Sequence, residues 1–454
     1  MISSAYGLLR RMHPTILLLL SYLAAIALGS AALMLPLSTH SGTISIIDAL
    51  FTATSAVCVT GLIVVDTGSY FTLFGQCVIL LLIQLGGIGI MTISVLLFQT
   101  IGKKMAFQQR MAMQEVFSHT PREDIYALIR SVVIFTLLIE SVGAIILFFY
   151  WTRAYPVSTS AYMAVFHSVS AFCNAGFSLF DTSFMAEQSS VTINMTIMML
   201  IILGGLGFPV LYEIYSRSTG RRQGKISIQT KVVFITSAAL IFAGAAVLLT
   251  AQNNLVPSPG VGQAFMAALF QSVTCRTAGF NTIDIASLNT AVLLFMMLLM
   301  FIGASPGSCG GGIKTTTFTV LAVFSWSRLR RHKHVNLFRK TVPEQTVAKC
   351  TSVMVLSFTA ICITVFLILL VDPGHGSHIG GDRQFLSYLF ETISAFGTVG
   401  LSMGVTPTLT AFGKTMIITL MIIGRVGVPA FTYIIAGAGS PGGIQYAEEN
   451  MMIG

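Results

Sequence analysis

Four short stretches of the chain end in the same way, with two residues that have small or medium-sized side chains followed by glycine. The tripeptides are Val59-Thr60-Gly61, Asn174-Ala175-Gly176, Thr277-Ala278-Gly279 and Thr398-Val399-Gly400. Glycine adopts positive φ values without steric cost, so such a segment can turn successive backbone carbonyls toward one side. Rings of carbonyl oxygens can replace the hydration shell of a cation. Together the tripeptides predict a cation site built from backbone.

Each tripeptide closes a longer semi-polar motif that begins with Leu-Phe or Val-Phe. The motifs occupy residues 50–61, 165–176, 269–279 and 389–400, and the third is one residue shorter than the others. We expect each motif to form a helix too short to cross a bilayer, whose partly negative C-terminal end points at the cation. Their recurrence at long, nearly regular intervals predicts a fourfold internal repeat.

The composition places these motifs in a membrane. Hydrophobic residues make up 54% of the chain, charged residues make up 9%, and the mean hydropathy is +0.84. Apolar segments of spanning length are predicted at 14–36, 72–100, 124–150, 190–216, 230–251, 287–327, 344–371 and 408–436. The fold class expected is an all-α polytopic membrane protein with four tandem parallel helix/pore-loop/helix repeats around a central pore. The repeats would span residues 1–100, 101–216, 217–327 and 328–454.

The inner segment of the third repeat is interrupted by glycine, proline and lysine. The residues singled out in this gating loop, 303–314, are Gly303, Ser305, Pro306, Gly307, Gly310, Gly311, Gly312 and Lys314. Backbone that leaves the helix at membrane depth must face protein or water, and an intramembrane lysine suggests function by default. The other inner segments carry glycine pairs near residues 86, 204 and 424, expected to allow close packing of straight helices.

Acidic residues follow three of the four tripeptides at a fixed distance. Asp66, Asp181 and Asp284 each stand five positions after the glycine. Carboxylates there would raise the cation concentration at an outer mouth, and helix capping is an equally good explanation. His167 lies within the second motif, where we expect a packed, hydrogen-bonded side chain rather than an ion ligand.

Basic residues set the expected orientation. Most of the 25 lysines and arginines lie in the N-terminal segment and the connections between repeats, so both termini should be cytoplasmic. The net charge of +9 is thus explained by topology, without a nucleic-acid partner. The seven cysteines show no metal-ligand or disulfide spacing. Gly310-Gly-Gly-Ile-Lys314-Thr lacks the spacing and the strand of a phosphate-binding loop, so no enzyme activity and no bound cofactor is expected.

Three sets of residues give the chain a close resemblance to a known family. They are the four motifs, the string Gly310-Gly-Gly-Ile-Lys314-Thr-Thr-Thr317, and Gly424-Arg425-Val426-Gly427. On these the chain resembles the Trk/Ktr/HKT superfamily of potassium transporters over nearly its whole length, and within it the membrane subunits of bacterial Ktr systems. The resemblance implies potassium uptake across the bacterial cytoplasmic membrane, with potassium held at the filter carbonyls, and it allows sodium dependence.

The resemblance also implies partners. It suggests a homodimer, with the tail 448–454 at the subunit interface, resting on a cytosolic KtrA-like ring that binds ATP or ADP. The ring would dock on the basic cytoplasmic connections of the chain, and membrane lipids would contact the same connections.

The resemblance assigns roles to individual residues as well. It implies that loop 303–314 obstructs permeation beneath the filter, with Arg425 of the fourth inner helix facing it. Gly61 stands where some sodium-preferring plant members have serine, which favours potassium. Cys309 departs from the small residues usual in this loop. The alternative considered is a secondary symporter for an organic or amino-acid substrate, which would require broken helices in inverted halves.

Overall fold

The structure is a computed structural model that describes residues 14–89, 92, 125–220, 224–251, 260–371 and 381–427. The basic connection 101–123, the start of the chain and the C-terminal tail, for which orientation and interface roles were predicted, lie outside the described residues. Almost every described element is a helix, as predicted. The strands in the described part are β1 (Asn336–Leu337) and β2 (Lys340–Thr341), which form an antiparallel hairpin with Asn336 opposite Thr341.

Four long helices have the length and apolarity to cross a membrane. They are α2 (Pro14–Leu33), α8 (Ile125–Trp151), α12 (Ile228–Ala251) and α16 (Glu344–Val371). Large apolar side chains on them face outward: Leu28 is 73% exposed, and Phe149 and Phe242 are each 66% exposed. Such a surface is stable only against lipid, because water would favour the opposite arrangement.

After each long helix the chain forms one short buried helix and one inner helix. The short buried helices are α3 (Ile46–Val57), α9 (Val157–Phe172), α13 (Val261–Thr274) and α17 (Gly381–Gly397). The inner helices are α5 (Leu73–Ile88), α10 (Val191–Leu206), α14 (Thr290–Phe301) and α18 (Ala411–Val426). A polar side chain caps each inner helix by accepting a backbone N–H; the caps are Thr72, Ser190, Asn289 and Thr410.

The inner helices are not the straight spans that the sequence suggested. Three of them end at glycines with positive φ: Gly89 at 89°, Gly207 at 94° and Gly427 at 97°. After Gly207 the chain turns by 94° into α11 (Phe208–Ser218). In the third repeat residues 302–314 separate α14 from α15 (Thr315–Leu329). The expectation that only the third inner helix is broken was therefore wrong, because glycine at each helix end lets the backbone leave the helical path.

Short turns of helix connect the larger elements along the chain, and all but the first directly precede an inner helix. They are η1 (Pro36–Ser38), α4 (Thr67–Tyr70), η2 (Met185–Glu187), η3 (Ile285–Ser287) and η4 (Thr406–Thr408).

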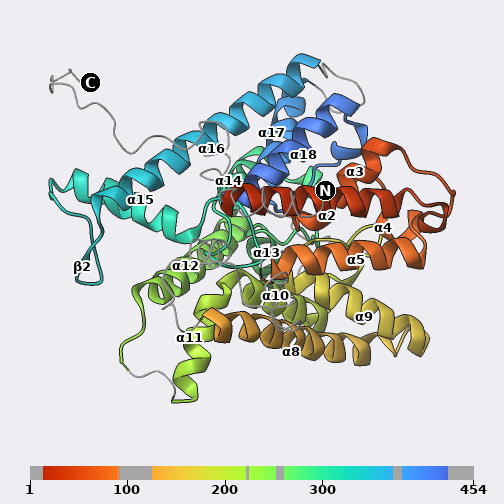
Figure 1. The fold of residues 1–454 in the computed structure, drawn as a ribbon, viewed down its shortest axis with the longest axis horizontal. Coiled ribbons are helices and arrows are strands. Elements are labelled where there is room, and N and C mark those ends of the chain that lie inside the picture. Colours follow the sequence, from red (N-terminus) through yellow and green to blue (C-terminus); the bar gives the residue numbers. More distant parts are fainter. Residues whose placement is uncertain are drawn as a thin grey trace, which may run out of the picture.

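The helices are arranged in a closed cycle. Each inner helix packs against the short buried helix of the next part of the chain, α5 on α9, α10 on α13 and α14 on α17, and α18 returns to pack on α3. Figure 1 shows the result, with the red, yellow, green and blue parts of the chain following one another around the centre. This closure brings the ends of the four short buried helices to one place.

Candidate cation site

Four glycines from distant parts of the chain form a closed ring at the ends of the short helices. A Cβ built on Gly176 would lie 3.0 Å from the Cα of Gly279, and one on Gly61 would lie 3.0 Å from the Cα of Gly176. A Cβ on Gly279 would lie 3.2 Å from the Cα of Gly400, and one on Gly400 would lie 3.0 Å from the Cα of Gly61. We call these four residues the glycine ring.

Backbone carbonyls of the middle tripeptide residues border this ring. A Cβ on Gly176 would lie 2.9 Å from the carbonyl oxygen of Ala278, and one on Gly279 would lie 2.6 Å from that of Val399. A Cβ built on Gly61 would lie closer still to the carbonyl oxygen of Ala175, as would one on Gly400 to that of Thr60. Because real Cβ atoms do not approach so closely, glycine is required at all four positions. The twelve predicted residues are thus brought together, each repeat touching the next.

The first residue of each tripeptide holds an unusual backbone conformation. Its φ is 57° at Val59, 59° at Asn174, 79° at Thr277 and 49° at Thr398. The glycines two residues later also have positive φ, from 71° at Gly176 to 91° at Gly400. Positive φ is an outlier for β-branched residues such as valine and threonine, and it persists only where the surroundings impose it. Left-handed residues at alternate positions allow the intervening carbonyls to turn toward one side, the arrangement that the sequence predicts for a cation site.

A hydroxyl in each short helix hydrogen-bonds the backbone at the end of the tripeptide that follows or just after it. Ser55 Oγ accepts the N–H of Gly61 at 3.1 Å, and Ser394 Oγ accepts that of Gly400 at 3.0 Å. In the other two repeats Ser170 and Thr274 donate to the carbonyls of Phe177 and Phe280, at 2.7 and 2.6 Å. These residues occur at matching positions in all four motifs, so aligning the repeats against one another would have identified them from sequence.

The missing residue of the third motif has a local structural explanation. In three repeats the middle tripeptide residue donates its N–H to the carbonyl five residues earlier, as Thr60 does to Ser55 at 2.7 Å. In the third repeat Ala278 donates to Thr274, only four residues earlier, at 3.0 Å. The deletion therefore shortens the turn after the helix by one residue and leaves Gly279 in the ring.

The glycine-rich loop, residues 302–314, lies against the first residues of two tripeptides. The N–H of Gly311 donates to Thr398 Oγ1 at 2.9 Å. A Cβ on Gly310 would collide with the Thr277 hydroxyl, and the Asn174 amide lies 3.1 Å from that same hydroxyl. The predicted gate residues Gly310 and Gly311 are thus in contact with the predicted filter.

Backbone hydrogen bonds attach this loop to the surrounding inner helices. Ser305 and Cys309 donate their N–H groups to the carbonyls of Gly205 and Gly204, at 3.1 and 3.2 Å. Gly312 donates to Gly424 at 3.3 Å, and Gly307 accepts the N–H of Phe208 at 2.9 Å. The loop backbone is therefore satisfied by protein rather than lipid, as membrane burial demands.

Arg425 holds the loop against two helices at once. Its guanidinium donates to the carbonyls of Cys309 in the loop and of Gly86 in α5. Lys314 bonds within the loop, its Nζ donating to the Gly310 carbonyl at 2.7 Å, and it precedes α15 as the N-cap residue. Cys309 is fully buried. The side chains of Lys314 and Arg425 thus both donate to carbonyls of this loop.

The other residues singled out from sequence lie apart from the ring. Asp66 caps α4 by accepting the N–H of Ser69 at 2.7 Å, and Asp284 caps η3 by accepting that of Ala286 at 3.0 Å. Asp181 is exposed. The capping explanation thus holds for Asp66 and Asp284, and the outer-mouth role stays a prediction for all three.

His167 is a packed histidine, as predicted. Its Nδ1 donates to the Met163 carbonyl at 2.8 Å, and its Nε2 accepts the N–H of Leu179 at 3.2 Å. The ring stacks on Phe180, with ring centroids 5.0 Å apart. Both nitrogens are occupied, so the imidazole is neutral and braces the segment after the second tripeptide.

Removing the hydroxyl behind the glycine ring should destabilise the site. In Ser394→Ala the buried N–H of Gly400 loses its acceptor, which costs about 1–3 kcal/mol. We therefore expect a lower Tm for the purified chain. Ser352→Ala is the matched control, because its exposed hydroxyl bonds the Ala348 carbonyl of its own helix. Equal Tm values in the two variants would contradict the role given to Ser394.

The fold is that of a helical membrane protein in which backbone carbonyls from four tripeptides border one ring of glycines. The family model described as TrkH, cation transport protein, matches residues 12–439. The chain belongs to this family, which confirms the resemblance drawn from its motifs.

Individual relatives agree with this assignment. The chain is 38% identical to "Ktr system potassium uptake protein B" of Vibrio alginolyticus, covering 96% of this chain and 94% of the relative. It is 38% identical to the protein of the same name from Bacillus subtilis, covering 94% of each. It is 35% identical to "Potassium/sodium uptake protein NtpJ" of Enterococcus hirae, covering 98% of each. The crystal structure of the potassium transporter TrkH from Vibrio parahaemolyticus has the same fold, with a TM-score of 0.71 at 20% identity over 94% of this chain and 84% of that one.

Proposed function

We propose that this chain is the ion-translocating pore subunit of a potassium uptake system. The observation that carries the proposal is the glycine ring, closed by four tripeptides with alternating left-handed backbone. The names of the relatives supply the ion, since the geometry alone specifies a cation. Residues 59–61, 174–176, 277–279 and 398–400 then form the selectivity filter, with potassium at their carbonyls.

Four parallel repeats around one pore account for the architecture. The proposed repeats are residues 1–100, 101–216, 217–327 and 328–454, each with a long outer helix, a short pore helix and an inner helix. The cyclic packing of inner helices on the next pore helix supports this division. The pore crosses the bacterial cytoplasmic membrane, with both termini on the cytoplasmic side, and Asp66, Asp181 and Asp284 lie toward its outer mouth.

The glycine-rich loop is the gate in this proposal. Gly310 and Gly311 lie against Thr277 and Thr398 at the filter, and Arg425 holds the loop there. Lys314 and Arg425 add positive charge that repels a cation below the filter. Conduction then requires the loop to move.

Control of the gate falls to partners outside this chain. The names of the relatives place them in a Ktr system, which supports a further subunit. In this proposal that subunit is a cytosolic nucleotide-binding ring that takes ATP or ADP, beneath a homodimer of this chain. Exposed basic residues at the end of α15, Arg330 and Arg331, offer a surface for the ring or for lipid headgroups. Sodium dependence is consistent with the name of the Enterococcus relative.

The test is uptake of rubidium, as a potassium tracer, into liposomes that contain the purified chain. We expect rubidium uptake that unlabelled potassium competes for, and more uptake when the cytosolic partner is present. Parallel liposomes with and without sodium measure sodium dependence. Uptake of a labelled amino acid with no rubidium flux would refute the proposal in favour of a symporter.

A further inference from the structure

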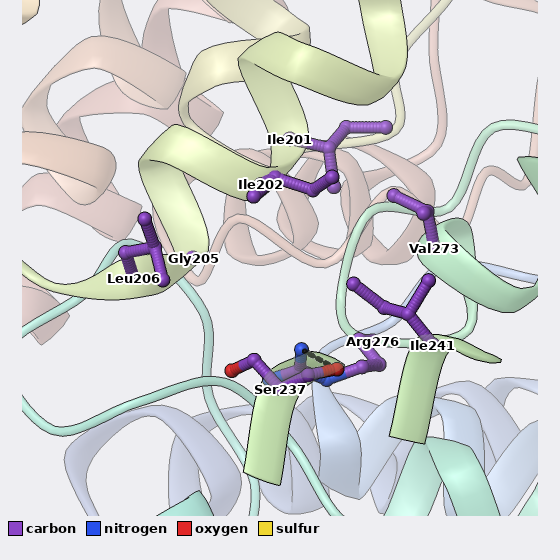
Figure 2. Close-up of a pocket in the computed structure, with 8 residues that line it drawn as sticks. All are labelled: Ile201, Ile202, Gly205, Leu206, Ser237, Ile241, Val273 and Arg276. Carbon is purple, nitrogen blue, oxygen red and sulfur yellow. Dashed lines mark hydrogen bonds between the residues drawn. The ribbon is translucent and has the colours of Figure 1, made fainter. Parts of the chain in front are cut away.

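A small cavity behind the third tripeptide is lined by a buried arginine side chain. It lies between α10, α12 and α13, and its lining includes Arg276, Ser237 and apolar side chains such as Ile201 and Ile241. Figure 2 shows Arg276 lying beside Ser237, with Ile201 and Ile202 across from them. Arg276 directly precedes the filter residue Thr277. The cavity is therefore adjacent to the filter backbone, outside the ion path itself.

The polar groups of this cavity need an acceptor. Arg276 is 8% exposed and Ser237 is 5% exposed. Within the described structure, Arg276 Nε and Ser237 Oγ have no hydrogen-bond partner, and the guanidinium makes only a long 3.5 Å bond to the Ser237 carbonyl. Both unpartnered groups can donate a hydrogen bond. A ligand that satisfies them must be an acceptor.

The charge of the guanidinium narrows the choice of ligand. The ion pairs of the described residues are Arg217 with Glu213 and Lys414 with Asp48, so Arg276 has no carboxylate partner among them. A buried charge without a counter-charge costs several kcal/mol in a protein interior. A water molecule would accept the hydrogen bonds but would leave the charge of the guanidinium without a counter-charge. An anion would satisfy both.

Volume and lining determine which anion fits. The cavity volume is about 20 Å³, and one water needs about 10–15 Å³. Phosphate, carboxylates and lipid headgroups would leave further acceptor oxygens against the apolar side chains that make up most of the lining. We propose that this cavity is a site for a single monovalent halide, chloride in the cell, held by the Arg276 guanidinium and the Ser237 hydroxyl. The bound halide neutralises a positive charge next to Thr277 that would otherwise oppose a cation in the filter. This inference goes beyond the proposed function, and its test measures binding independently of transport.

The first experiment compares the Tm of the purified full-length chain in potassium chloride and in potassium gluconate at equal concentration. A ligand that binds only the folded state raises stability, so chloride should raise Tm by about 2–4 °C in a saturable way. Ser237→Ala should reduce the shift and Arg276→Gln should abolish it. Thr236→Ala, next to Ser237 and bonded to Thr319 at 2.7 Å, is the matched control and should keep the shift.

The second experiment is a crystal structure of the wild-type chain in sodium bromide. An anomalous bromide peak beside Arg276 supports the proposal. An ordered water in that place overturns it, as does an equal Tm of the wild type in both anions. Equal chloride shifts in the wild type and in Arg276→Gln also overturn it, because the halide would then bind elsewhere. If Arg276→Gln does not fold, Ser237→Ala decides in its place.

Discussion

Alanine in place of Gly400 is expected to reduce selective potassium flux strongly while the chain still folds and inserts. The new Cβ would collide with the carbonyl oxygen of Thr60 and lie 3.0 Å from the Cα of Gly61. Both neighbours are backbone atoms, so neither can rotate away, and the carbonyl that would bind the cation must move. If that movement raises the barrier for ion passage by about 1.4 kcal/mol, the rate of flux falls tenfold. We therefore expect at least about a tenfold loss of flux.

The four ring glycines should form a graded series. The Cβ would be closest to the neighbouring carbonyl at Gly400 and Gly61, 2.6 Å away at Gly279 and 2.9 Å away at Gly176. Gly176→Ala should accordingly be the mildest of the four in liposome rubidium flux and in potassium over sodium selectivity. Gly61→Ser and Gly279→Ser should weaken that selectivity for the same reason.

Gly404→Ala is the control for backbone strain. Gly404 has a φ of 86°, close to the 91° of Gly400, yet no described atom lies within 4 Å of a Cβ built there. Both substitutions carry the same left-handed cost of about 1–2 kcal/mol, but only one disturbs the ring. If Gly404→Ala reduced flux as much as Gly400→Ala, strain would explain the loss and the ring would not.

The sequence predicted the parts of this site that recur in all four repeats. It did not predict backbone conformations that packing against other parts of the chain imposes. The glycines were found because a tripeptide recurred four times, and glycine has few other reasons to recur in that pattern. Nothing in the side chains of Val59 or Thr398 announces a positive φ, because β-branched residues disfavour it. Their conformation is imposed by the closed cycle of helices, which exists only in the folded chain.

The ends of the inner helices show the same limit. A hydropathy window treats Gly89, Gly207 and Gly427 as ordinary members of an apolar run, so the runs were expected to be straight. The glycine pairs were expected to bring inner helices together. Instead, Gly86, Gly204 and Gly424 each let an inner helix approach the backbone carbonyl at the end of a short buried helix, those of Val57, Phe172 and Phe396. Spacing along the chain indicated close contact but could not name the partner.

Deleting residues 304–311 should produce a chain that conducts without its cytosolic partner. Gly303 and Gly312 are already neighbours, since a Cβ on Gly303 would lie 3.2 Å from the Cα of Gly312, and Ile302 pairs with Ile313. The two flanks run parallel and lie close enough for a short linker in place of residues 304–311 to join them. The deletion removes the backbone that touches Thr277 and Thr398. We expect rubidium flux in liposomes without the partner to rise at least about tenfold, the effect of about 1.4 kcal/mol of barrier.

Two further variants make the deletion interpretable. Arg425→Gln removes the guanidinium bonds to Cys309 and Gly86 but leaves the loop bonds to Gly204 and Gly205, so its flux should rise less than that of the deletion. Adding Gly400→Ala to the deletion should suppress the new flux, because ions released by the missing loop must still pass the glycine ring. Flux that survives in the double variant would come from a leak through a misfolded chain. Flux that never rises above wild type in the deletion would mean that this loop does not close the pore.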